Sequence, residues 1–89
     1  MPQRYRLHCR ELAPGLVLPP DLQKLLRLVL ASIETADSAV NCLIAQAKAE
    51  GVCLGLDTGH VLPRPHIERV EILIDNAASY RLAELACDR

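Results

Sequence analysis

The sequence predicts a mainly α-helical fold, and three observations support this prediction. Apolar residues recur at helical spacing between Pro20 and Glu50, and again between His66 and Arg89. The 89 residues contain no Phe and no Trp, so the core consists of Leu, Ile, Val and Ala, which favours closely packed helices. We therefore expect a single small domain in which helices at about 20–50 and about 66–88 form an antiparallel pair.

The first predicted helix has an apolar face and recognisable ends. Pro20 suits the first turn, where no backbone N–H is needed, and Asp21 complements the helix dipole there. Gly51 suits the position after the last turn. Steps of one, three or four residues connect the apolar face, which comprises Leu22, Leu25, Leu26, Val29, Ile33, Ala36, Val40, Leu43 and Ala47.

The length of this helix predicts an association with another chain. At about 1.5 Å per residue, a helix over 20–50 is roughly 46 Å long, whereas a compact chain of this size is about 31 Å across. Additional leucines beside the main stripe make the first half apolar on several sides. We expect a helix–helix interface formed by Leu25, Leu28, Leu30 and Ile33. In the alternative, the helix breaks near 32–38 into two pieces that fold back within one monomer.

The segments outside the helices are expected to be short strands, connectors and loops. In residues 1–10, Arg4, Arg6 and Arg10 alternate with apolar residues, which predicts a short strand. The remainder of 1–19 reads as an extended connector that lays its leucines on the core. Residues 51–65 combine short apolar runs with turn residues and predict a hairpin or structured loop. Gly55 suggests a bulge or a close backbone approach there.

The segment 66–89 permits two interpretations. Apolar residues at steps of three and four favour a helix, with Pro65 in its first turn and an Arg81–Glu84 pair on its surface. The β-branched residues in 68–74 favour a strand instead. In that case the fold would be α+β, with a small sheet that includes 68–74.

No residue pattern in the sequence predicts an enzyme. Cys9 follows His8, but adjacent residues of a strand point to opposite faces and do not form a nucleophile–base pair. Cys42, Cys53, His60 and His66 are of the types that bind zinc, but their spacing matches no zinc motif. We therefore predict no catalytic residue, no cofactor and no metal, and keep a small metal-stabilised domain as an alternative.

Charge and hydropathy limit the possible partners. Ten basic and eleven acidic residues nearly cancel, so no general attraction to nucleic acid is encoded. A nucleic-acid-binding module that uses Arg4, Arg6 and Arg10 is an alternative interpretation. The N-terminus lacks the apolar run of a secretory signal, and no stretch is long and apolar enough to span a bilayer. We expect a cytoplasmic protein without a membrane partner.

The surplus apolar surface predicts a small intracellular protein-interaction protein. We expect a homodimer that binds another protein through helices, as a regulator or inhibitor that blocks or sequesters a larger protein. The low aromatic content and alanine-rich helices are shared by many small bacterial and phage proteins. This likeness is one of composition alone and identifies no family.

Overall fold

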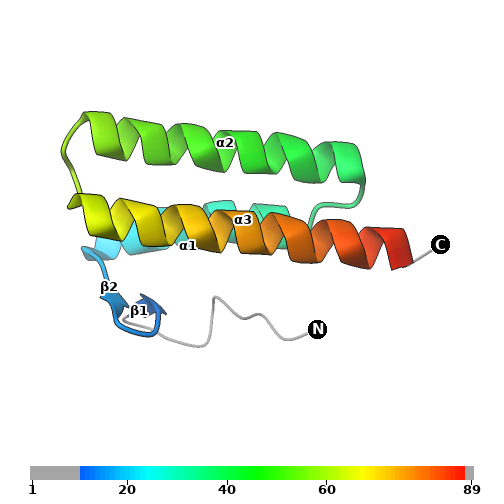
Figure 1. Cartoon of the computed structure of the whole chain (residues 1–89), viewed down its shortest axis with the longest axis horizontal. Helices are drawn as coiled ribbons and strands as arrows, with labels where there is room; N and C mark the ends of the chain where they lie inside the picture. Colours follow the sequence, from blue (N-terminus) through cyan, green and yellow to red (C-terminus); the bar gives the residue numbers. More distant parts are fainter. Residues whose placement is uncertain (1–10, 88–89) are drawn as a thin grey trace.

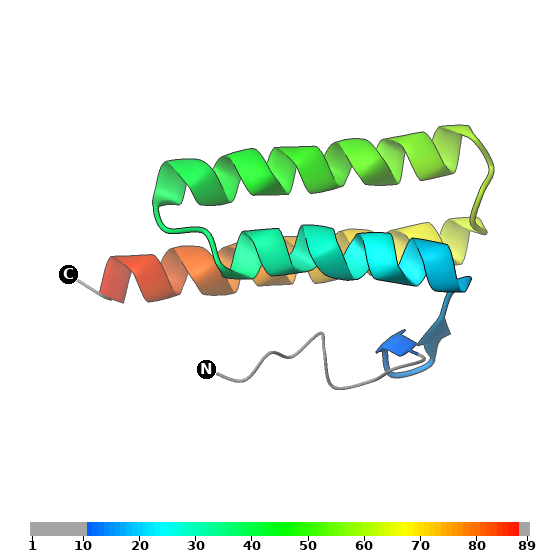
Figure 2. The same ribbon diagram turned by 180° about the vertical axis from the view of Figure 1, so that it is seen from behind.

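The structure is a computed structural model that describes residues 11–87, and it is a bundle of three helices with a small N-terminal hairpin (Figure 1). The mainly α-helical prediction is confirmed. Helices α1 and α3 run in the same direction, and α2 runs antiparallel to both (Figures 1 and 2). The elements are β1 (Glu11–Ala13), β2 (Leu16–Val17), α1 (Pro20–Glu34), α2 (Ala39–Thr58) and α3 (Arg64–Cys87).

The predicted continuous helix over 20–50 is wrong, because the chain turns back between Thr35 and Ser38. Ser38 is extended, and its hydroxyl oxygen accepts a hydrogen bond from the backbone N–H of Asn41 at 3.1 Å. This contact caps the first turn of α2. The alternative in which the helix breaks near 32–38 therefore describes the chain.

A hydrogen bond connects the turn between α1 and α2 to α3. The Nε atom of Arg81 donates a hydrogen bond to the carbonyl oxygen of Ala36 at 2.7 Å. The same guanidinium contacts Glu84 at 3.3 Å, which confirms the predicted pair. Since Ala36 is itself buried, both packing and hydrogen bonding stabilise the turn between α1 and α2.

The predicted hairpin or loop at 51–65 is also wrong. Helix α2 continues through Gly51 and Gly55 to Thr58, because the apolar residues on its inner face, such as Cys53 and Leu56, pack against the other two helices. It ends in a Schellman motif, in which the N–H of Val61 bonds the carbonyl of Leu56 at 3.0 Å. His60 occupies the left-handed position of this motif, with φ of 54°.

Residues 68–74 are helical, so the α+β alternative is wrong. Helix α3 buries one face at steps of three, four and one residue, and this packing outweighs the strand preference of its β-branched residues. Pro65 lies in its first turn, as predicted. The buried residues of α3 are Ile67, Val70, Ile74, Ala77 and Ala78.

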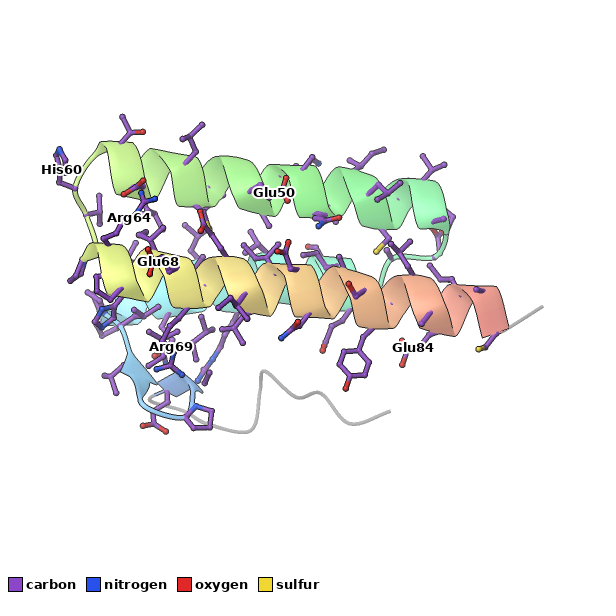
Figure 3. The ribbon with its side chains drawn as sticks, viewed as in Figure 1. Glu50, His60, Arg64, Glu68, Arg69 and Glu84 are labelled. Atoms are coloured by element: carbon purple, nitrogen blue, oxygen red, sulfur yellow. The ribbon has the colours of Figure 1, made fainter. Side chains whose placement is uncertain are left out.

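The N-terminal connector forms an antiparallel hairpin that the sequence did not predict. Pro14 and Gly15 make its turn, and Gly15 takes a positive φ of 78°. The side chain of Arg69 reaches from α3 to the carbonyl oxygen of Pro14 at 2.8 Å (Figure 3). The expectation that this connector lays leucines on the core is confirmed for Leu12, Leu16 and Leu18. The predicted strand with Arg4, Arg6 and Arg10 lies outside the described residues.

The core lies between the three helices and contains aliphatic residues, alanines and two thiols. The fully buried large side chains come from the hairpin and from all three helices. These buried side chains are Leu12, Leu16, Leu26, Leu30, Ile33, Cys42, Cys53, Ile67, Val70 and Ile74.

No helix in the described part of the chain combines the length and apolarity needed to cross a membrane.

The cap at Ser38 gives a first prediction. Ser38→Ala removes the acceptor for the Asn41 N–H and is expected to lower the free energy of unfolding by about 1 kcal/mol. Urea denaturation followed by circular dichroism measures this loss. Ser79→Ala, at an exposed position within α3, is the control and should leave the midpoint nearly unchanged. Equal effects of the two substitutions would contradict a capping role.

Candidate protein-interaction surface

The outer face of α2 is apolar along its length. Apolar residues follow one another there at steps of three, one, three and seven, while the opposite face of the helix is buried against α1 and α3. The side chains of Val40 and Leu54 are 65% and 67% exposed. We call this face the apolar ridge, and its residues are Val40, Leu43, Ile44, Ala47 and Leu54.

Two glycines lie on the same outer face of α2, beside the large side chains of the ridge. Gly51 and Gly55 follow Ala47 at steps of four, so these three small residues form one strip along the helix. A Cβ atom on either glycine would meet nothing within 4 Å, and neither has a positive φ. Glycine inside a helix is about 0.5–1 kcal/mol less favourable than alanine. Contacts within the described chain therefore do not require glycine at these positions.

On one side of the ridge, α1 and α2 form a groove with both apolar and polar side chains. It has a volume of about 260 Å³ and contains one cationic side chain, Lys48. The view from behind shows these two helices side by side (Figure 2). The residues that line the groove are Val29, Ser32, Asn41, Ile44, Ala45 and Lys48.

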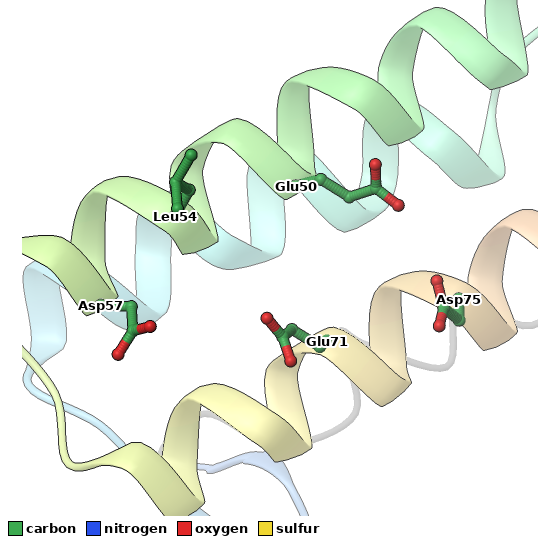
Figure 4. Close-up of a pocket in the computed structure, with 5 residues that line it drawn as sticks. All are labelled: Glu50, Leu54, Asp57, Glu71 and Asp75. Carbon is green, nitrogen blue, oxygen red and sulfur yellow. The ribbon is translucent and has the colours of Figure 1, made fainter.

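On the other side, α2 and α3 form an acidic groove of about 350 Å³ (Figure 4). The carboxylates of Glu50 and Asp57 come from α2, and those of Glu71 and Asp75 come from α3. At one end, Arg64 forms ion pairs with Asp57 and with Glu68, the latter at 3.7 Å between Nε and Oε2. The ridge is therefore bordered by negative charge on one side and by a lysine on the other.

The two cysteines of α2 are buried beneath the ridge. Burial raises the pKa of the Cys53 thiol to about 11, and the nearby Glu71 and Glu50 carboxylates contribute to the shift. Burial also raises the pKa of Cys42, whose thiol lies 3.8 Å from the carbonyl oxygen of Ala78. Both cysteines therefore stay protonated near neutral pH and act as small apolar side chains.

The structure separates the four residues of the predicted interface. Leu25 and Leu28 are exposed on α1, and Leu28 is 60% accessible. Leu30 and Ile33 are fully buried in the core of the single chain, so their side chains are not accessible to a partner. The reason is the break at 35–38, which lets α1 bury this face against α3 and α2.

The sequence pattern also missed the true outward face of α2. It placed Val40, Leu43 and Ala47 on the same inner stripe as the α1 residues, but the turn changes the orientation of the helix and directs them outward. Their place in the core is taken by residues such as Cys42 and Ala49. The available signal was that 39–56 is apolar on nearly every side.

The alternative sites are not assembled in the described part of the chain. Arg4, Arg6 and Arg10 lie outside it. Within residues 11–87, no three His, Cys, Asp or Glu side chains are arranged to hold a metal ion. Of the predicted zinc-type residues, Cys42 and Cys53 are separate buried residues of α2, and His60 is exposed in the turn after it.

Comparisons with known proteins found no matching family model, no similar curated protein and no similar solved structure.

The raised pKa of Cys53 predicts a loss of stability in alkali. The unfolded thiol ionises near pH 9 and the folded one near pH 11, so Cys53 stabilises the fold fully below pH 9 and loses this contribution as pH rises to about 11. The loss is on the order of 2 kcal/mol.

The measurement compares urea denaturation at pH 8 and at pH 11 for the parent chain and Cys53→Ala. We compare the change with pH in each protein, because the substitution also leaves a cavity. Cys53→Ala should lose less stability than the parent between the two pH values. An equal loss would show that Cys53 does not titrate as described.

Proposed function

We propose that this chain is a small protein-interaction module that presents the apolar ridge of α2 to a helix of another protein chain. The observation that carries the proposal is that one whole face of a 20-residue helix is both apolar and exposed. A surface helix normally directs charged and polar residues to solvent. On α2 these residues, such as Lys48 and Glu50, lie at the borders of the exposed face.

The shape of the surface supports a helix as the bound element. Leu43, Ile44 and Leu54 are exposed on either side of a strip of small residues, so the strip itself carries no large side chain. An amphipathic helix places apolar anchors at steps of three and four, and these anchors fit such a surface. On α1, the exposed Leu25 and Leu28 add further apolar surface.

We propose a regulatory role for this binding. A module of this size acts on a larger protein by covering a helix that the larger protein needs for its own assembly or activity. It then behaves as a regulator or inhibitor that blocks or sequesters its target. This role follows from the proposed mode of binding and depends on the same ridge.

A photo-crosslinking amino acid placed at Leu54 tests the proposal in the cell from which the chain derives. Position 54 should crosslink to protein, whereas the same probe at the exposed Glu68 of α3 should give little product. An absence of protein adducts at position 54 above the level at position 68 would overturn the proposal.

Leu43→Glu should reduce the crosslinking yield at position 54 at least about tenfold, because it places a charge in the apolar contact. Ile72→Glu is the matched control, since Ile72 is exposed to a similar degree on α3. Thermal unfolding should show that both variants remain folded, with stabilities within about 0.5 kcal/mol of the parent.

A further inference from the structure

We infer that the helix bound by the apolar ridge is α2 of a second copy of this chain, packed parallel to the first about a two-fold axis. The inference rests on the proposed function and specifies its partner. It is carried by two features of α2: the open strip of small residues, and the opposite charges on the two sides of the ridge.

The small residues permit two helices to approach closely. The distance between packed helices depends on the side chains at the point of contact. At Gly51 and Gly55 the space above the backbone is open, and Ala47 extends the same strip by one turn. A second α2 crossing near Gly51 would fill this space with its own strip. The large ridge residues of each helix would then pack beside the backbone of the other.

The charges beside the ridge favour a parallel arrangement. Lys48 lies on the α1 side of the ridge, and Glu50 lies on the α3 side at nearly the same height along the helix. In a parallel pair related by a two-fold axis, the α1 side of one helix meets the α3 side of the other. Each Lys48 would therefore face Glu50 of the second copy, and the pairing would occur twice.

An antiparallel arrangement would bring like charges together. In that symmetry, the α3 side of one helix meets the α3 side of the other. With a crossing near Gly51, Glu50 would lie near Glu50 of the second copy, between the acidic grooves of both chains. Like charges placed across an interface disfavour association. The charge distribution therefore selects the parallel dimer.

The contact area predicts a dimer that forms reversibly. Helix α2 has 20 residues and is about 30 Å long. A pair of such helices offers a contact smaller than the interfaces of about 1,200–2,000 Å² that form stable complexes. The dimer should therefore appear as the protein concentration is raised.

Sedimentation equilibrium over a range of protein concentrations tests for the second copy. The parent chain should shift from monomer to dimer, and Gly51→Leu should raise the dissociation constant at least about tenfold by blocking close approach. Ser79→Leu, which adds the same side chain at an exposed position of α3, is the control. Circular dichroism should show that all three proteins are folded, since a side chain at Gly51 meets nothing within 4 Å.

Charge exchange tests the pairing. Lys48→Glu should weaken the dimer, because two pairs of carboxylates would then face each other. The double variant Lys48→Glu with Glu50→Lys should restore dimerisation, because both pairings are rebuilt with the signs reversed. A double variant no stronger than Lys48→Glu alone would contradict the proposed contact.

Cysteine crosslinking tests the orientation. Ala47→Cys and Gly55→Cys, both on the strip of small residues, are prepared separately in a chain in which Cys9 and Cys87 are replaced by serine, so that Cys42 and Cys53, both buried, are the remaining native thiols. In a parallel dimer, each position lies opposite itself, and both variants should form disulfide-linked dimers. In an antiparallel dimer, at most one of the two positions lies opposite itself, so a disulfide in only one variant would overturn the parallel arrangement.

The outcomes separate this inference from the proposed function. A chain that stays monomeric at every concentration, with cellular crosslinks from position 54 to a different protein, would overturn the second copy as partner and retain the interaction module. Crosslinks from position 54 to the same chain, together with the concentration-dependent dimer, would support the interaction module with a second copy as its partner and would count against a different protein as the target.

Discussion

The structure depends on the turn at residues 35–38, which divides the predicted helix over 20–50 into α1 and α2. A helix that continued past Glu34 would carry the apolar residues of α2 away from the core formed by α1 and α3. The cap at Ser38 and the hydrogen bond from Arg81 to the Ala36 carbonyl stabilise the reversal. Because the chain turns back here, Leu30 and Ile33 find their partners within the same molecule.

The same reversal creates the exposed ridge. Helix α2 is apolar on nearly all sides, but among the described residues it packs mainly against α1 and α3, on its inner face. Its inner face is filled by Cys42, Ala49 and Cys53, and no fourth element in the described residues covers the outer face. The surplus of apolar surface expected from the sequence therefore exists. It includes the outer face of α2, one helix further along the chain than the four residues of the predicted interface, which all lie on α1.

The charged residues on the two sides of the ridge distinguish the two orientations in which a helix could bind. Four carboxylates gather between α2 and α3, whereas the groove between α1 and α2 carries Lys48 and otherwise neutral side chains. An apolar strip alone would not distinguish one orientation of a bound helix from the other. Unequal charge on its two sides makes that distinction, and the open glycines determine where along the helix the closest approach is possible.

The sequence by itself determined that the chain is mainly helical, where α1 begins, that a connector lays leucines on the core, and that Arg81 pairs with Glu84. These features depend on local periodicity, on proline at a helix start and on residues a few positions apart. The tertiary structure decided where the rod breaks, that α2 passes through Gly51, and which faces are buried. Several local structures are compatible with a serine at position 38, with a glycine at position 51 and with a segment that is apolar on all sides. Packing against distant residues of α3 determines which of these structures forms. Leu30 and Ile33, two of the four predicted interface residues, are buried for the same reason: which sides of α1 and α2 face outward depends on how the chain turns at Ser38.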